Sequence, residues 1–153
     1  MNLAIRPAQS ADLAALAEMR ALLWPDGSVE EHRRELSSAF SGEAVSTLPT
    51  ATFVAASEEG ALIGFLEAGL RSHADGCDTS RPVGFVEGWF VLEAFRGRGV
   101  GEELMRAAEA WARSQGCREM ASDALIDNEP SIDAHEALGF EIVDRCVHFR
   151  KNL

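Results

Sequence analysis

A turn rich in glycine and arginine separates an apolar run from a helical pattern in this chain of 153 residues. The turn reads Arg96-Gly97-Arg98-Gly99-Val100-Gly101 and follows an apolar run that ends at Leu92. A strand that leads through glycines into a helix exposes backbone N–H groups at the positive end of the helix, which favours an anion. Glycines allow close approach of phosphate oxygens, and the arginines can add charge-assisted hydrogen bonds. The turn therefore predicts a phosphate-binding site.

The spacing of the glycines excludes two well-known phosphate loops. A P-loop needs Gly-Lys-Ser/Thr after its four-residue gap, and that sequence is absent. A dinucleotide-binding fingerprint needs G-x-G-x-x-G, whereas Gly97, Gly99 and Gly101 are spaced two apart. The remaining alternative is a glycine-rich turn with incidental arginines.

Two acidic residues stand out against their apolar surroundings. Glu87 interrupts the run 83–92, and Asp123 lies in the stretch 118–125. A buried carboxylate is costly without a partner, so a plain core role for Glu87 is disfavoured. The chain carries 25 acidic residues against 14 Lys and Arg, a formal net charge of −11. This charge argues against nucleic acid and anionic membrane as partners and is compatible with a cationic substrate.

The remaining sequence predicts the elements that position these residues. A length of 153 residues predicts one domain, 1–153, and periodicity and turn signals predict a mixed sheet with helices against its faces. Ser28 to Glu31 has the form of a capping box. The predicted strands are 3–8, 52–57, 61–70, 83–92, 118–125 and 140–151. The predicted helices start at Ser10 to Asp12, at Ser28, at Val100 and at Glu129.

The start of the chain and its cysteines indicate a cytoplasmic protein. The first residues carry charges at Arg6 and Asp12 and no long apolar run, so we expect neither a signal peptide nor a membrane span. The three cysteines are odd in number and lack metal or redox spacing, which favours reduced thiols and no metal site.

Arg96-x-x-Gly99-x-Gly101, between an apolar strand and an amphipathic helix, resembles the acetyl-CoA pyrophosphate loop of the GCN5-related N-acetyltransferase (GNAT) family. The opening "IRPAQSADLAAL" and "ALGF" at 137–140 resemble that family as well. The resemblance implies the GNAT fold, an α/β arrangement with a mixed, mostly antiparallel sheet, and acetyl-CoA as cosubstrate. It also implies coenzyme contacts by the turn and the preceding strand: Trp89, Phe90, Val91, Arg96, Gly97, Arg98, Gly99, Val100 and Gly101.

Further stretches are similar to the aminoglycoside 6′-N-acetyltransferases of that family: "GFVEGWFVL", "REMASDAL", "LLWPD", "GCDTSRP", Asp127-Asn128 and "VHFRKNL". By this resemblance Trp24, Glu87, Asp123 and Asp144 would face the aminosugar, Asn128 would lie beside the coenzyme, and a homodimer is expected. The chain has no tyrosine, so His73 or Ala74 replaces the aromatic residue common in this loop. A solvated loop histidine is the alternative for His73, and a surface ion pair is the alternative for Asp144.

The expected reaction is direct attack of the amine on the thioester, with Glu87 or Asp123 as base. A backbone N–H near Val91 or Leu92 would polarise the thioester carbonyl. The tyrosine that protonates the leaving thiolate in much of the family is missing, so the thiolate would leave unassisted or take a proton from water. Three rival functions remain: acetylation of another amine, such as a polyamine, a catalytically silent coenzyme-A-binding domain, and an anion-binding module without enzyme activity.

Overall fold

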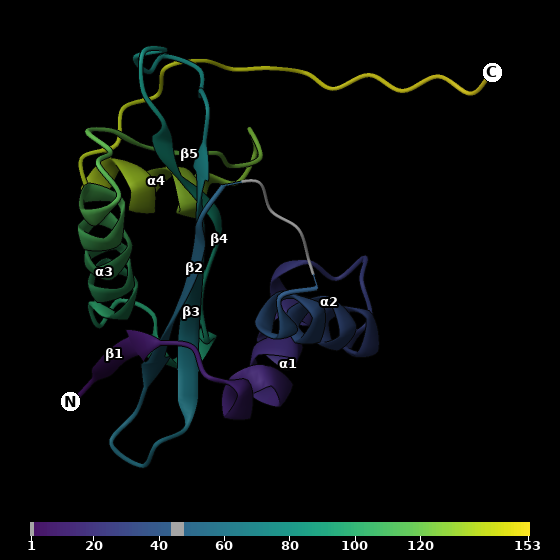
Figure 1. The fold of residues 1–153 in the computed structure, drawn as a ribbon, viewed down its shortest axis with the longest axis vertical. Helices are drawn as coiled ribbons and strands as arrows, with labels where there is room; N and C mark the ends of the chain where they lie inside the picture. The colour runs from purple at the N-terminus through teal and green to yellow at the C-terminus, as the bar shows by residue number, and fades with distance from the viewer. Residues whose placement is uncertain (1, 44–47) are drawn as a thin grey trace.

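The computed structural model describes residues 2–43 and 48–153, which form one mixed sheet with helices against both faces (Figure 1). The strands lie in the spatial order β1-β2-β3-β4-β5. The first four pair antiparallel, and β5 runs parallel to β4. Their bounds are Ala4–Pro7 (β1), Thr50–Ala56 (β2), Leu62–Arg71 (β3), Val83–Val91 (β4) and Met120–Ser122 (β5). The predicted mixed, mostly antiparallel sheet is confirmed.

Helices α1 (Leu13–Leu23) and α2 (Val29–Ser41) cover one face of the sheet, and α3 (Val100–Ser114) and α4 (Glu129–Ala137) lie on the other side (Figure 1). Short 3-10 turns, η1 (Ser10–Asp12) and η2 (Glu93–Phe95), precede α1 and α3. The capping box is confirmed: Glu31 N donates to Ser28 Oγ at 3.1 Å, and Ser28 N donates to Glu31 at 2.9 Å. Within the described ranges, no helix has both the length and the apolar character to cross a membrane.

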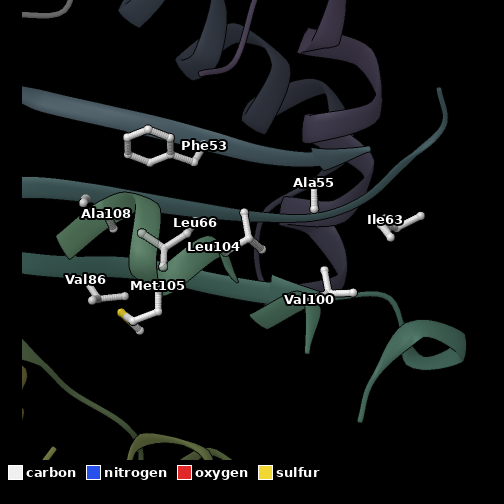
Figure 2. Close-up of a cluster of buried hydrophobic side chains, with 10 residues drawn as sticks. Phe53, Ala55, Ile63, Leu66, Val86, Val100, Leu104, Met105 and Ala108 are labelled. Carbon is white, nitrogen blue, oxygen red and sulfur yellow. The ribbon is translucent and has the colours of Figure 1, made fainter. Parts of the chain in front are cut away.

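The strands place alternate side chains in two cores. Phe53 and Ala55 point toward α3, whereas Val54 between them is fully buried against α1 and α2. Figure 2 shows the α3 side, where Leu104 and Met105 meet the sheet. The two cores fix the sheet between its helix layers, and every functional residue of β4 therefore points to one layer or the other.

A β-bulge interrupts the pairing of β3 with β4 at Glu87. Glu67 pairs with Gly88 and Ala68 pairs with Val86, so Glu87 has no residue opposite it. Glu87 and Gly88 consequently both project toward the α1–α2 layer. A methyl group built on Gly88 would meet Trp24 of that layer, and Glu87 Oε1 lies 4.0 Å from the corresponding position on Gly69.

The prediction of a strand at 140–151 is wrong. Residues 141–153 run extended and away from the body, without strand pairing (Figure 1). This C-terminal segment exposes large apolar side chains, with Val147 at 73% and Phe149 at 93%. A strand needs a neighbour to satisfy its backbone N–H and C=O groups, and the segment pairs with none of the residues that the structure describes. Strand β5 is also shorter than predicted, ending at Ser122.

Candidate active site

The glycine turn has a left-handed backbone at two of its glycines. Gly97 and Gly99 have φ of 70° and 82°, in the left-handed region that favours glycine, and Gly99 caps the start of α3. The indole of Trp89 donates from Nε1 to Gly101 O at 3.1 Å. The first N–H groups of α3 therefore open onto the turn, beside the ring of Trp89.

Two acidic residues in the first turn of α3 would oppose an anion, but Arg106 pairs with both. Its guanidinium lies 2.6 Å from Glu102 and 2.7 Å from Glu103. The arginines of the turn itself are placed differently. Arg96 Nε donates to Val91 O at 2.8 Å, and the Arg98 guanidinium lies 5.7 Å from the Phe95 ring. The turn thus keeps two guanidinium groups next to the end of β4.

Strands β4 and β5 part at the middle of β4 and leave a fork. Their pairing ends at Val86 and Ser122, so β4 from residue 87 onward has β3 on one side and no strand of the described chain on the other. Leu92 N donates to Ile63 O at 2.9 Å. Antiparallel pairing alternates, so the Val91 N–H points the opposite way, into the fork. Of the two N–H groups expected to polarise a thioester, Val91 is suitably directed and Leu92 is not.

Glu87 lies on the α1–α2 side of this fork, and Arg71 holds its carboxylate. Arg71 Nε and Nη2 lie 3.0 and 2.8 Å from the two Glu87 oxygens. The guanidinium stacks 3.4 Å from the centroid of the Phe85 ring. Hydrogen bonding to Glu87, and more weakly the charge of Asp123, raises the pKa of Arg71. Glu87 and Asp123 are therefore close enough for one guanidinium to respond to both.

Trp24 completes this side of the site. Its ring covers Gly88, where an added methyl group would lie 2.5 Å from Trp24 Cη2. Arg20 lies 5.1 Å above the same ring, and His32 Nε2 is 3.1 Å from Trp24 O. Only glycine at position 88 permits this approach, so the tryptophan packs against β4 at the residue after Glu87.

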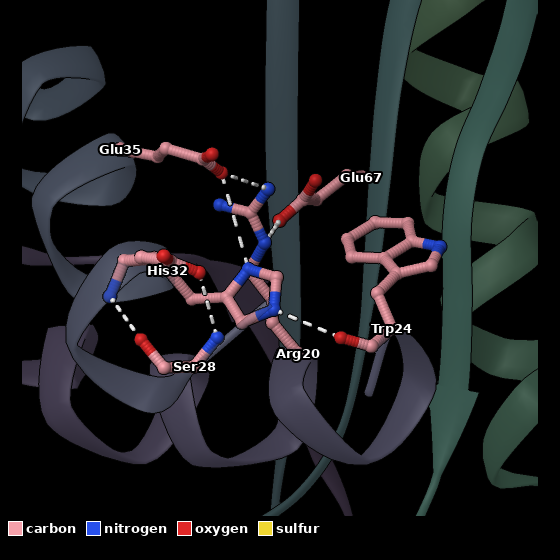
Figure 3. Close-up of polar contacts among 7 residues, drawn as sticks. Arg20, Trp24, Ser28, His32, Glu35 and Glu67 are labelled. Atoms are coloured by element: carbon pink, nitrogen blue, oxygen red, sulfur yellow. Dashed lines mark hydrogen bonds and ion pairs between the residues drawn. The ribbon is translucent and has the colours of Figure 1, made fainter. Parts of the chain in front are cut away.

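A buried polar network fixes the helices behind Trp24 (Figure 3). Arg20 bridges Glu35 of α2 at 3.1 Å and Glu67 of β3 at 3.4 Å. Burial raises the pKa of the Glu67 carboxyl, and the charge of Arg20 opposes that rise. Arg20 Nε, His32 Nδ1 and Glu67 Oε1 are buried and make no hydrogen bond to the residues that the structure describes. The network couples the position of Trp24 to the sheet.

The other predicted site residues lie in three different places. Asn128 caps α4, where its side chain accepts from Ser131 N at 3.3 Å. His73 is exposed in the loop after β3, within 3.1 Å of Ser72 Oγ. Asp144 is exposed on the C-terminal segment, where its carboxylate accepts from Arg145 N at 2.7 Å.

Sequence reasoning missed Arg71, Arg20 and Glu67. Their partners lie on other elements, 16 residues away in the pair of Arg71 with Glu87. A weak signal existed, because Glu67 and Arg71 are charged residues at the end of an otherwise apolar strand. The structure also pairs Ser122 with His135, at 2.7 Å.

Comparison with known proteins identifies the family. The family model described as acetyltransferase (GNAT) family matches residues 16–140. The chain is 41% identical over 149 residues to an aminoglycoside N(6')-acetyltransferase type 1 of Klebsiella aerogenes, covering 97% of this chain and 96% of that protein. It is likewise 41% identical, over 152 residues, to the enzyme of that name from Stenotrophomonas maltophilia, covering 97% and 93%.

Solved structures agree with the sequence matches. AAC(6')-Iy, in complex with the bisubstrate analog CoA-S-monomethyl-acetylneamine, is 36% identical with a TM-score of 0.86, and 100% of each chain is covered. AAC(6')-Ih from Acinetobacter baumannii is 35% identical with a TM-score of 0.86, over 99% of each chain. The GNAT fold that the resemblance implied is confirmed. The chain therefore belongs to the GNAT family of acetyltransferases, and its sequence groups it with the aminoglycoside N(6')-acetyltransferases of that family.

Proposed function

We propose that this protein transfers the acetyl group of acetyl-CoA to the 6′-amine of an aminoglycoside antibiotic, by direct attack of the amine on the thioester. One observation carries the proposal: the whole chain matches AAC(6')-Iy, at a TM-score of 0.86, in a complex whose ligand name joins CoA to acetylneamine. Such a ligand requires donor and acceptor to meet in one site. That arrangement needs no covalent intermediate on the protein.

The donor half of the site is the fork with the glycine turn. The N–H groups of α3, together with Arg96 and Arg98, present positive potential to a pyrophosphate. The open edge of β4 offers N–H and C=O groups that an extended pantetheine arm can pair with, as an added strand does. The Val91 N–H, directed into the fork, would polarise the thioester carbonyl. Asn128, at the start of α4, would lie beside the coenzyme.

The acceptor half would lie on the α1–α2 side, formed by Glu87, Asp123 and Trp24. An aminoglycoside carries several ammonium groups, and carboxylates from different elements can bind them together. Glu87 is already paired with Arg71, with 41% of its side chain exposed. An ammonium group would therefore join or displace Arg71 on this carboxylate. Glu87 or Asp123, directly or through water, then removes the proton that the attacking amine must lose.

The decisive experiment compares two aminoglycosides that differ only in an amine or a hydroxyl at the 6′ carbon. Thiol release from acetyl-CoA is followed with each, and NMR locates the acetylated nitrogen. We expect turnover with the amine alone, because the hydroxyl is a far poorer nucleophile. Transfer to a different ring contradicts the regiochemistry. Turnover only with polyamines or other amines assigns another acceptor, and CoA binding without any turnover indicates a silent domain.

We also propose that the protein is a homodimer, through its C-terminal segment. Residues 141–153 expose apolar side chains that a single copy leaves uncovered: Ile142, Val143, Val147, Phe149 and Leu153. A second copy can pair with this segment as an added strand, which buries those side chains and satisfies the backbone. Asp144 lies on the segment, so its part in the acceptor site depends on where the segment packs.

The mass of the protein in solution tests the dimer. Light scattering is expected to give two chains for the intact protein and one chain after truncation at Phe140. An intact protein that stays monomeric at high concentration would contradict the pairing of this segment with a second copy.

The proposed location is the cytoplasm, where the donor and the antibiotic's target are found. The three cysteines Cys77, Cys117 and Cys146 are free thiols, as a reducing compartment would keep them. Burial raises the pKa of the Cys117 thiol, and burial with nearby Glu119 does so for Cys77, which makes both poor nucleophiles.

A further inference from the structure

Ser122 and His135 form a hydrogen-bonded pair that none of the roles above uses. Ser122 Oγ lies 2.7 Å from His135 Nε2, and His135 Nδ1 lies 2.6 Å from Ser131 O. A backbone carbonyl only accepts, so Nδ1 carries a hydrogen and Nε2 is left to exchange a proton with the serine. A hydroxyl, an imidazole and a group that orients the imidazole are the parts of a proton relay.

Aromatic neighbours hold the imidazole in this orientation. The Trp89 ring lies edge-to-face at 5.2 Å between centroids, with planes at 85°. Phe140 packs in the same way at 5.3 Å and 78°. Both Ser122 and His135 are partly buried. The pair therefore has a fixed geometry without being sealed off from the fork.

The pair lies at the point where β4 and β5 separate. Ser122 is the last residue of β5 and pairs with Val86, directly before Glu87. Its side chain reaches His135 on the side of Trp89, whereas Glu87 projects to the side of Trp24. A thioester in the fork would thus have the acceptor carboxylates on one side and the Ser122 hydroxyl on the other. This placement rests on the proposed function, through the donor site.

The reaction needs a proton at that place. When the amine displaces the coenzyme, the sulfur leaves as a thiolate and must be protonated to give the free thiol. The chain contains no tyrosine that could supply the proton. We propose that Ser122 and His135 deliver a proton to the departing sulfur, with Ser122 Oγ as the group that contacts it.

The step balances in protons and electrons. The C–S bond breaks and its electron pair stays on sulfur. Sulfur takes the Ser122 hydroxyl proton while Ser122 Oγ takes the Nε2 proton of the His135 imidazolium. The imidazole is left neutral and regains a proton from water. The ammonium substrate loses two protons in becoming an amide, so one proton per turnover is released in total.

Two single variants and their combination test the relay. Ser122→Ala removes only the hydroxyl, and His135→Phe keeps a ring between Trp89 and Phe140. We expect kcat to fall about 100-fold in each. The acetyl-CoA KM and CoA affinity should stay within about twofold, because neither side chain is needed to bind the donor. The kcat of the double variant should be no lower than that of either single variant, since the two residues act as one unit. Ser114→Ala, a hydroxyl deletion at the end of α3, is the matched control and should leave kcat unchanged.

Two results overturn the relay: kcat within about twofold of wild type in Ser122→Ala, or a loss that appears only in the acetyl-CoA KM. NMR of the ring nitrogens provides an independent check, and an Nδ1 without its hydrogen would contradict the premise. The kinetic series uses whichever amine the wild-type protein acetylates fastest in a thiol-release screen. Failure of aminoglycosides as acceptors would therefore refute the proposed substrate and leave the relay to be decided by its own variants.

Discussion

Replacing Glu87 with glutamine separates the two roles proposed for this carboxylate. The change preserves the shape of the side chain and removes its charge. In the structure both Glu87 oxygens accept from Arg71, at 3.0 and 2.8 Å, and the residue has no partner across the bulge in β4. Glutamine can keep one of the two hydrogen bonds, so the strand and the bulge are expected to remain.

The exposure of the pair sets the expected effect on stability. The side chains of Arg71 and Glu87 are 45% and 41% exposed, and such ion pairs contribute about 0–1 kcal/mol to folding. A charge-assisted contact to a bound ammonium group is worth about 1.5–3 kcal/mol, which corresponds to a KM for the acceptor raised roughly 10- to 150-fold. If Glu87 is also the base, kcat should fall about 100-fold or more.

Steady-state kinetics with saturating acetyl-CoA measures these quantities, and thermal unfolding measures stability. Glu109→Gln on α3 is the matched control, because it removes the same charge from the other side of the sheet. The control should behave like wild type. The acetyl-CoA KM should stay near wild type in Glu87→Gln as well, since the carboxylate lies on the side proposed for the acceptor.

Wild-type values of both kcat and the acceptor KM in Glu87→Gln would show that β4 has been placed wrongly against the acceptor. Asp123→Asn measured beside it decides which carboxylate is the base. The substitution that lowers kcat about 100-fold identifies the residue that acts as the base. A substitution that changes only the acceptor KM identifies a binding residue.

Three further predictions concern other parts of the molecule. Gly101→Val should raise the CoA dissociation constant about tenfold or more, because even its Cβ would lie 3.0 Å from Trp89 Cζ2; calorimetry showing unchanged affinity would reject the coenzyme loop. Arg20→Met should lower the free energy of unfolding by about 3 kcal/mol, since it leaves Glu67 buried without its cation, and adding Glu67→Gln should recover most of that loss in urea titrations. Asp12→Asn should cost about 1.5–3 kcal/mol at neutral pH, because hydrogen bonding to Arg6 holds the pKa of the Asp12 carboxyl below its ordinary 3.8. Because the pKa of Asp12 is lowered in the folded protein, the ion pair stabilises the fold at a pH above 3.8, and this stabilisation is lost as the pH falls through the lowered pKa. The free energies of unfolding of the two proteins should therefore converge in acid. A difference between them that does not change with pH would refute the ion pair.

The sequence alone determined the local features of this protein. The glycines at 97 and 99 permit the positive φ angles of the turn, the capping box at Ser28 starts a helix, and the apolar run 83–92 forms a strand. These features depend on the backbone preferences and periodicity of neighbouring residues, which can be read within a few positions. The mixed-sheet class followed from these elements, whereas the acetyl-CoA loop was expected only from the resemblance to the family to which the chain belongs.

Tertiary structure decided which charged groups meet. The pairs of Glu87 with Arg71 and of Ser122 with His135 join residues 16 and 13 positions apart, on different elements. The bulge that turns Glu87 toward Trp24 arises from the register of β3 against β4. The strand predicted at 140–151 failed for a related reason. Its residues have strand propensity, but a strand also requires a partner edge, and whether one is available depends on how the whole chain, or a second copy, is arranged in space.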